Sequence, residues 1–284
     1  MSDKKIDDVT GISTTGHEWD GIRELDNPMP RWWLWTFYAT IVWALAYTIA
    51  YPAWPLISSA TNGMLGYSSR AELRTELDGA VAARADYAAA VAAAPVEDII
   101  ADEALRQFAT SAGAAAFKVN CVQCHGSGAA GSAGYPNLND DEWLWGGTPE
   151  DIRVTIAHGI RFEADGKTRF SEMPAFGGML GRDEVTALAT HVKALGEGGD
   201  LSGPGAELFA NNCASCHGEA GKGDITLGAP DLTDAIWLYG STSADIAAQI
   251  RAPRHGVMPG WIDRLGETTV KELTVYVHSL GGGQ

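Results

Sequence analysis

The sequence is poor in basic residues, and this shortage excludes one class of partner. Its 284 residues include 20 lysines and arginines against 36 aspartates and glutamates, which gives a formal net charge of −16. A nucleic acid partner is excluded, because binding a phosphate backbone requires a basic surface. The acidic surface suits a basic protein partner, or it serves only to keep the protein soluble.

Cysteine is also scarce, and the spacing of the four that are present decides their use. They form two C-x-x-C pairs, each followed at once by a histidine: Cys121, Cys124 and His125, then Cys213, Cys216 and His217. In this pattern the two thiols bind a porphyrin covalently and the histidine ligates its iron. A thioredoxin-like motif needs a βαβ context, and a four-thiol zinc site would ignore both histidines. The sequence therefore predicts two covalently bound haem c groups.

The first 30 residues lack the apolar core of a cleavable signal peptide and form a polar segment without a regular pattern. From Trp32 to Ile57 no residue is charged, and about 20 apolar residues suffice to cross a bilayer as a helix. Five of the ten tryptophans lie there, as in the aromatic belts of membrane-spanning helices. We predict one transmembrane helix within residues 31–57, ending near Pro52 and Pro55; a buried core helix is the alternative.

Charge around this segment predicts its orientation. Four basic residues precede it: Lys4, Lys5, Arg23 and Arg31. Only Arg70 and Arg74 follow it closely. Because cytoplasmic flanks are enriched in lysine and arginine, we expect residues 1–30 to be cytoplasmic.

Residues 58–103 form a linker, and the rest of the chain is an internal repeat. The linker contains an alanine-rich run from Arg70 to Ala94 that predicts a helix ended by Pro95. In the repeat, WLWGGTPEDI at 143–152 matches WLYGSTSADI at 237–246, and VTALATHVKALG at 185–196 matches VKELTVYVHSLG at 270–281. We expect two tandem domains, at 104–198 and 199–284.

Each copy has a helical pattern at both ends. Residues 104–120 and 206–212 lead into the C-x-x-C-H turns, and residues 183–196 and 267–280 space their apolar residues as one face of a helix. The first copy carries a loop insertion within FEADGKTRFSE. The predicted fold is mainly all-α: an N-terminal transmembrane helix, a linker helix and two tandem class I cytochrome c domains.

Methionine is the predicted ligand on the other side of each iron. Met173 and Met258 are each followed by proline and occupy equivalent points of the two copies. A single methionine would more often be a core filler, but two in register favour one thioether ligand in each domain, opposite His125 and His217 respectively. Met179 is the local competitor of Met173. Histidine and methionine together fill both axial positions, which suits electron transfer and excludes oxygen chemistry.

Two further histidines, His158 and His255, are also in register. They could lie at a haem edge or propionate, although a structural hydrogen bond is the favoured role. Their roles stay open at this point.

A resemblance narrows the function. The motif WDGIRELDNPMPRWW before the apolar segment, followed by two C-x-x-C-H domains, resembles the di-haem subunit (subunit III) of cbb3-type cytochrome c oxidase. The resemblance covers essentially the whole chain. It implies a place in the bacterial inner membrane with both haem domains in the periplasm, where haem c attachment is completed.

The resemblance also implies partners. Such a subunit accepts electrons from a cytochrome c or the bc1 complex and passes them to a mono-haem subunit. From there they reach the catalytic haem–copper subunit, which reduces oxygen and pumps protons. The chain would then be an electron-transfer subunit of an oxidase without oxygen chemistry of its own.

Four other functions remain as alternatives. A membrane-tethered di-haem shuttle and the cytochrome subunit of a dehydrogenase need the same haem sites. A gas-binding sensor would need one iron without its methionine, and a di-haem peroxidase would need an iron with an accessible position.

Overall fold

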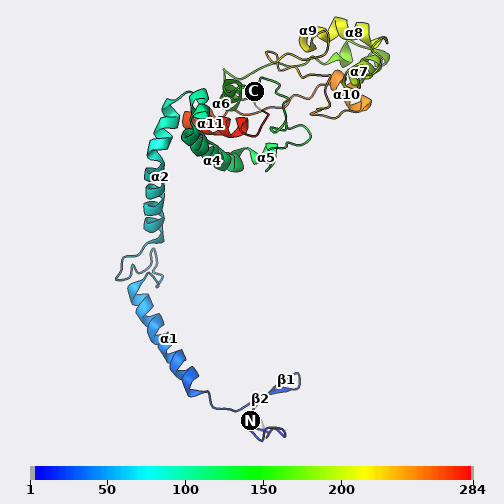
Figure 1. Ribbon diagram of the computed structural model, residues 1–284. Coiled ribbons are helices and arrows are strands. Elements are labelled where there is room, and N and C mark those ends of the chain that lie inside the picture. Colours follow the sequence, from blue (N-terminus) through cyan, green and yellow to red (C-terminus); the bar gives the residue numbers. More distant parts are fainter. Residues whose placement is uncertain (1–3, 283–284) are drawn as a thin grey trace. The chain divides into compact units, whose positions relative to one another are not determined.

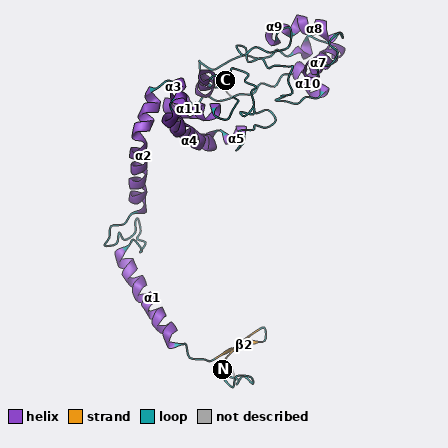
Figure 2. Cartoon of the chain, viewed as in Figure 1, coloured by secondary structure: helices purple, strands orange, loops and turns teal. Residues whose placement is uncertain are grey.

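A computed structural model describes residues 4–282, and helices dominate that part of the chain (Figure 1, Figure 2). The protein divides into two compact units, Met1–Ala83 and Arg84–Gln284. The predicted all-α class is confirmed.

The N-terminal segment contains a β-hairpin that the sequence pattern did not predict. Strands β1 (Thr14–Trp19) and β2 (Ile22–Leu25) pair antiparallel. Asp20 and Gly21 between them both have positive φ, 48° and 83°. Two-residue hairpin turns favour this conformation and often have the sequence Asp-Gly. The flanking residues do not alternate between apolar and polar, so the turn sequence alone did not predict a hairpin.

Helix α1 (Arg31–Ala50) is the candidate membrane span. It has a mean hydropathy of 1.3 over its most apolar window, and the protein buries none of its residues. At about 1.5 Å per residue its 20 residues are long enough to cross the hydrocarbon core. The helix ends before the apolar stretch does, because Tyr51 precedes Pro52 and is extended (φ −114°, ψ 160°).

Three helices follow in sequence: α2 (Ser69–Ala93), α3 (Val96–Ala101) and α4 (Glu103–Asn120). Helix α2 confirms the helix predicted from alanine content, and it ends one residue before Ala94. The Lys271 ammonium donates 2.8 Å hydrogen bonds to the carbonyl oxygens of Ala92 and Ala94. This cation satisfies carbonyl groups at the helix end that have no helical partner.

The first lobe consists of α4, α5 (Val122–His125), α6 (Pro149–His158) and α11 (Ile262–His278), which lie together in Figure 1. Apolar side chains of three helices form its core: Phe117, Ile152, Ile156, Val270, Leu273 and Val277. Burying such side chains is worth about 1.5–3 kcal/mol each relative to exposure. The core therefore depends on α11 as much as on α4.

The second lobe consists of η1 (Phe176–Gly178), α7 (Arg182–Glu197), α8 (Gly205–Asn212), α9 (Ala214–His217) and α10 (Ser243–Arg251). Its core has the same plan as the first: Phe176, Val185, Leu188, Val192, Phe209, Ile246 and Ile250. Thr242 caps α10 by accepting a hydrogen bond from the Asp245 amide, as Thr148 does with Asp151 at the start of α6.

The two copies of the repeat exchange their last helices. Helix α7 belongs to the first copy but packs in the second lobe, and α11 belongs to the second copy but packs in the first lobe. The repeat in the sequence predicts tandem domains at 104–198 and 199–284. Those bounds follow the repeat in the sequence, whereas the packing combines parts of both copies, since the apolar faces of α7 and α11 are alike.

Glycine permits both helix crossings. A Cβ on Gly113 of α4 would lie 2.1 Å from the carbonyl oxygen of Glu272 in α11. A Cβ on Gly205 of α8 would lie 2.4 Å from the carbonyl oxygen of Ala187 in α7. Real Cβ atoms do not approach backbone so closely, so each crossing requires a residue without a side chain.

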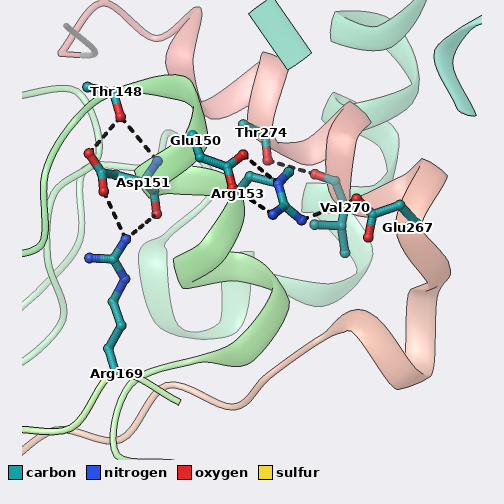
Figure 3. A network of polar contacts seen from close by, with 8 residues as sticks. All are labelled: Thr148, Glu150, Asp151, Arg153, Arg169, Glu267, Val270 and Thr274. Atoms are coloured by element: carbon teal, nitrogen blue, oxygen red, sulfur yellow. Dashed lines mark hydrogen bonds and ion pairs between the residues drawn. The ribbon is translucent and has the colours of Figure 1, made fainter. Parts of the chain in front are cut away.

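Polar contacts join α6 to α11 across the exchange (Figure 3). Arg153 of α6 binds Glu150 at 2.7 Å and reaches Glu267, close to the kink of α11, at 3.2 Å. In the same view Arg169, from the inserted loop, binds the Asp151 carboxylate at 3.0 Å. The inserted loop is thus fixed to the N-terminal end of α6.

The close crossing gives a stability prediction. Gly113→Ala should destabilise the protein by about 1–3 kcal/mol, because overpacking outweighs the better helix propensity of alanine. The matched control is Gly79→Ala, also inside a helix, where an added Cβ meets nothing within 4 Å. Thermal unfolding followed by circular dichroism measures both. Equal stability of the two variants would contradict the tight crossing.

Candidate haem-binding sites

The C-x-x-C-H residues form one short helical turn in each lobe, α5 and α9. The His125 ring is oriented by its Nδ1 atom, which lies 3.1 Å from the carbonyl oxygen of Pro136. His217 repeats this contact with Pro230 at 3.2 Å. Because the carbonyl accepts the Nδ1 proton, Nε2 of each ring keeps its lone pair for a metal.

Burial favours the neutral imidazole of both histidines, which is the form that can ligate an iron. It lowers the pKa of His125 and of His217, against the opposing effect of the proline carbonyls, so both rings are neutral at pH 7. Burial and the neighbouring cysteine raise the pKa of Cys121 and of Cys213 to about 11. All four cysteines are free thiols rather than disulfides.

The structure places the two methionines in the lobes opposite to those expected. Met258 packs against the first-lobe core together with Cys121. Met173 packs against the second-lobe core together with Cys213. The sequence predicts the pairs Met173 with His125 and Met258 with His217, because each pair lies in one copy of the repeat. The helix exchange carries each methionine loop with it, so Met258 shares a lobe with His125 and Met173 with His217.

A backbone pairing fixes the Met258 loop. The amide of Ile160 donates to the carbonyl oxygen of Met258 at 2.9 Å, and the Met258 amide donates to Ile160 at 3.0 Å. Gly159 has positive φ (71°), and a Cβ there would lie 2.1 Å from the Met258 oxygen. The loop is therefore held tightly against the end of α6.

The three remaining candidate residues, Met179, His158 and His255, differ in exposure and in hydrogen bonding. Met179, the competitor of Met173, is 63% exposed. His158 has a structural partner, with Nδ1 2.8 Å from the Asp165 carboxylate. Nε2 of His255 is buried and has no hydrogen-bond partner among the described residues.

Two aromatic residues in register occupy equivalent places in the lobes. The Trp143 indole donates a hydrogen bond to the carbonyl of Gly282, just beyond α11. Trp237 packs against the second-lobe core beside Gly196, at the end of α7. Each tryptophan thus lies near the C-terminal end of the exchanged helix of its lobe, which repeats the pattern seen for the methionines.

The donor set fits a haem better than a bare metal ion. Among residues 4–282 no three His, Cys, Asp or Glu side chains are grouped to hold an ion. Each lobe instead offers two thiols on one turn, an oriented imidazole and a partly buried thioether on a shared apolar core. Thiols for covalent attachment, with imidazole and thioether for the axial positions, match haem c. This fold and site define a c-type cytochrome.

Comparison with known proteins specifies the class further. Residues 11–58 match the model described as the N-terminal domain of cytochrome oxidase-cbb3, FixP. Residues 108–192 and 203–277 match the model for cytochrome c oxidase, cbb3-type, subunit III. The chain belongs to this family of cbb3-type oxidase subunits, which confirms the resemblance seen in the sequence and implies covalently bound haem c.

Several curated relatives are similar over almost their full length. The cbb3-type cytochrome c oxidase subunit FixP of Rhizobium meliloti is 58% identical, with 99% of this chain and 98% of the relative covered. Subunit CcoP of Cereibacter sphaeroides is 53% identical over 95% of each chain. FixP of Bradyrhizobium diazoefficiens is 50% identical, with 99% and 98% covered.

Glu142 is a titratable residue near the second-lobe site that was not predicted from the sequence. Glu142 accepts a 3.4 Å hydrogen bond from the amide of Asp231, which follows the proline that binds His217. Burial first, and then hydrogen bonding to the Asp234 carboxyl, raise the pKa of Glu142 from its ordinary 4.5 to about 7. No pattern in the sequence marks it, because its partners come from the other copy of the repeat.

Glu142 should make stability depend on pH. Because its pKa is raised, Glu142 stabilises the folded protein in its protonated form. This contribution to the free energy of unfolding is complete below about pH 4.5 and is lost as pH rises through about 7. Glu142→Gln should remove this part of the pH dependence, roughly 1–2 kcal/mol after allowance for solvent screening. Unfolding measured between pH 5 and pH 8 tests this, with Asp141→Asn as an exposed control. An unchanged slope in Glu142→Gln would reject the assignment.

Proposed function

We propose that each lobe binds one haem c covalently and that the lobes exchange their sixth ligands. In the first lobe Cys121 and Cys124 attach the porphyrin. His125 and Met258 would ligate its iron. The support is the packing of Met258 and Cys121 on one core and the orientation of His125 by Pro136.

The second lobe has the same plan with the other methionine. Cys213 and Cys216 attach the haem, and His217 and Met173 ligate its iron. The matching contacts are the packing of Met173 and Cys213 on one core and the hydrogen bond between His217 and Pro230. The single observation that carries the proposal is this repetition of one donor set in both lobes.

The ligand set favours electron relay over oxygen chemistry. A haem with histidine and methionine ligands supplies a reversible one-electron couple of raised potential. The histidine hydrogen bonds and the packed methionine loops hold the ligands in place, so an oxidation change requires little movement of the protein. No ligand position is left for oxygen, and the chain serves an oxidase without being its catalytic subunit.

The proposed route runs through an oxidase complex. Curated relatives are named as cbb3-type oxidase subunits, and we infer that this chain accepts electrons from a cytochrome c or the bc1 complex. It passes them to the mono-haem subunit and then to the catalytic haem–copper subunit. The net charge of −16 suits docking of a basic donor.

Membrane attachment belongs to the same proposal. Helix α1 is long and apolar enough to span a bilayer. Trp32, Trp35 and Trp43 on it are each at least 67% exposed, which leaves these indole rings accessible to lipid. The basic residues before α1 favour a cytoplasmic N-terminus, which puts both lobes in the periplasm of a bacterial inner membrane.

Purification of the intact complex tests the function. When this chain is affinity-tagged and extracted in detergent, we expect oxygen-consuming haem–copper activity and a second, mono-haem c-type band to accompany it. The measurement combines oxygen uptake with haem staining of denaturing gels. A chain that carries two haems but never brings oxidase activity would instead be a shuttle or a dehydrogenase subunit.

The ligand exchange has its own test. Cys124→Ala leaves one vinyl group unsaturated, which should shift the absorption of the first-lobe haem and so label it. In this background Met258→His should lower the reduction potential of the labelled haem, because imidazole replaces thioether. Met173→His is the matched control and should leave that potential unchanged. The opposite result would restore the pairing within each copy.

A further inference from the structure

Arg161 lies where the two methionine loops meet. It follows Ile160, whose backbone pairs with Met258, and it begins the loop inserted in the first copy. Its amide donates to the carbonyl oxygen of Arg169 at 2.8 Å, which closes the base of the inserted loop. The second copy has no equivalent loop. Arg161 therefore belongs to a loop that only the first copy of the repeat contains.

The guanidinium of Arg161 bonds to both methionine loops. Its Nε donates to the carbonyl oxygen of Gly256 at 2.8 Å, and its Nη1 donates to that of Ser171 at 2.9 Å. Gly256 is two residues before Met258, and Ser171 is two residues before Met173. One side chain thus fixes the approach of both thioethers, with two donors whose separation is set by the planar guanidinium.

The surroundings show that the contact is specific. Arg161 is partly buried and has no carboxylate within ion-pair distance among the described residues, so backbone carbonyls are its bonded partners. Burial lowers the pKa of its guanidinium, which still remains charged at neutral pH. Its φ is +52°, a conformation that costs free energy outside glycine. Tertiary contacts hold the residue in that conformation.

We propose that Arg161 is a positioning residue shared by both haem centres, which holds the Met173 and Met258 loops so that each sulfur stays on its iron. The proposal rests on the ligand set given under Proposed function. It predicts that one substitution, remote from the C-x-x-C-H turns in sequence, weakens two methionine ligands together.

The test compares Arg161→Gln with Arg161→Lys in the full chain. Arg161→Gln removes the charge and the forked donor, so the ferric methionine–iron band should weaken at both haems and both reduction potentials should fall. Added imidazole should bind both ferric haems about tenfold more tightly, because each loop loses one charge-assisted hydrogen bond. Arg161→Lys keeps the charge but offers a single nitrogen, and it should give an intermediate effect.

Arg153→Gln is the matched control. Arg153 forms ion pairs with Glu150 and Glu267 and, within residues 4–282, no hydrogen bond with either methionine loop, so its loss should change neither band. Haem staining shows whether both covalent haems remain. If Arg161→Gln does not retain both covalent haems, the methionine–iron bands of Arg161→Lys decide whether Arg161 acts on both haems. Backgrounds with Met173→His or Met258→His leave one methionine band each, which assigns every change to one haem.

The outcomes separate this role from the ligand set itself. Loss at both haems supports the shared role. A change at one haem only, or at neither, overturns it while the methionine ligands stand. A wild-type protein that lacks the methionine–iron band at either haem rejects the ligand set, and the role of Arg161 with it.

Discussion

Both lobes obtain their apolar cores through the crossing of helices between the two copies of the repeat. Helix α11 reaches α4 at Gly113, and α7 reaches α8 at Gly205, because no Cβ stands between the backbones. Each lobe therefore obtains the last helix of its core from the other copy. The exchange joins two domains of under about 100 residues into one larger folded unit, which buries a larger fraction of its surface than either domain would alone.

The same exchange determines the chemistry. The loops that bear Met173 and Met258 precede the exchanged helices, so they enter the opposite lobes with them. Ile160 pairs with the Met258 backbone at the crossing point. The Met173 and Met258 loops are thereby linked through Ile160 and Arg161, which bond to them. This suits a relay, whose parts must keep their geometry through many redox cycles.

Much of this could be predicted from the sequence, and the failures have physical causes. The C-x-x-C-H turns, the in-register methionines and the apolar positions Val185, Leu188, Val270 and Leu273 follow from local spacing, which the chain obeys. The exchange could not be predicted, because the apolar faces of α7 and α11 are similar and fit either partner. Arg161 was missed for a related reason: its partners, Gly256 and Ser171, are backbone carbonyls that no side-chain pattern marks.

The exchanged ligation is the central claim, and an experimental structure of the haem-loaded protein tests it most directly. The quantity to measure is the distance from each methionine sulfur to each iron. The account predicts that Met258 lies opposite His125, on the haem attached at Cys121, and that Met173 lies opposite His217. Finding Met173 on the iron bound by His125 would contradict it.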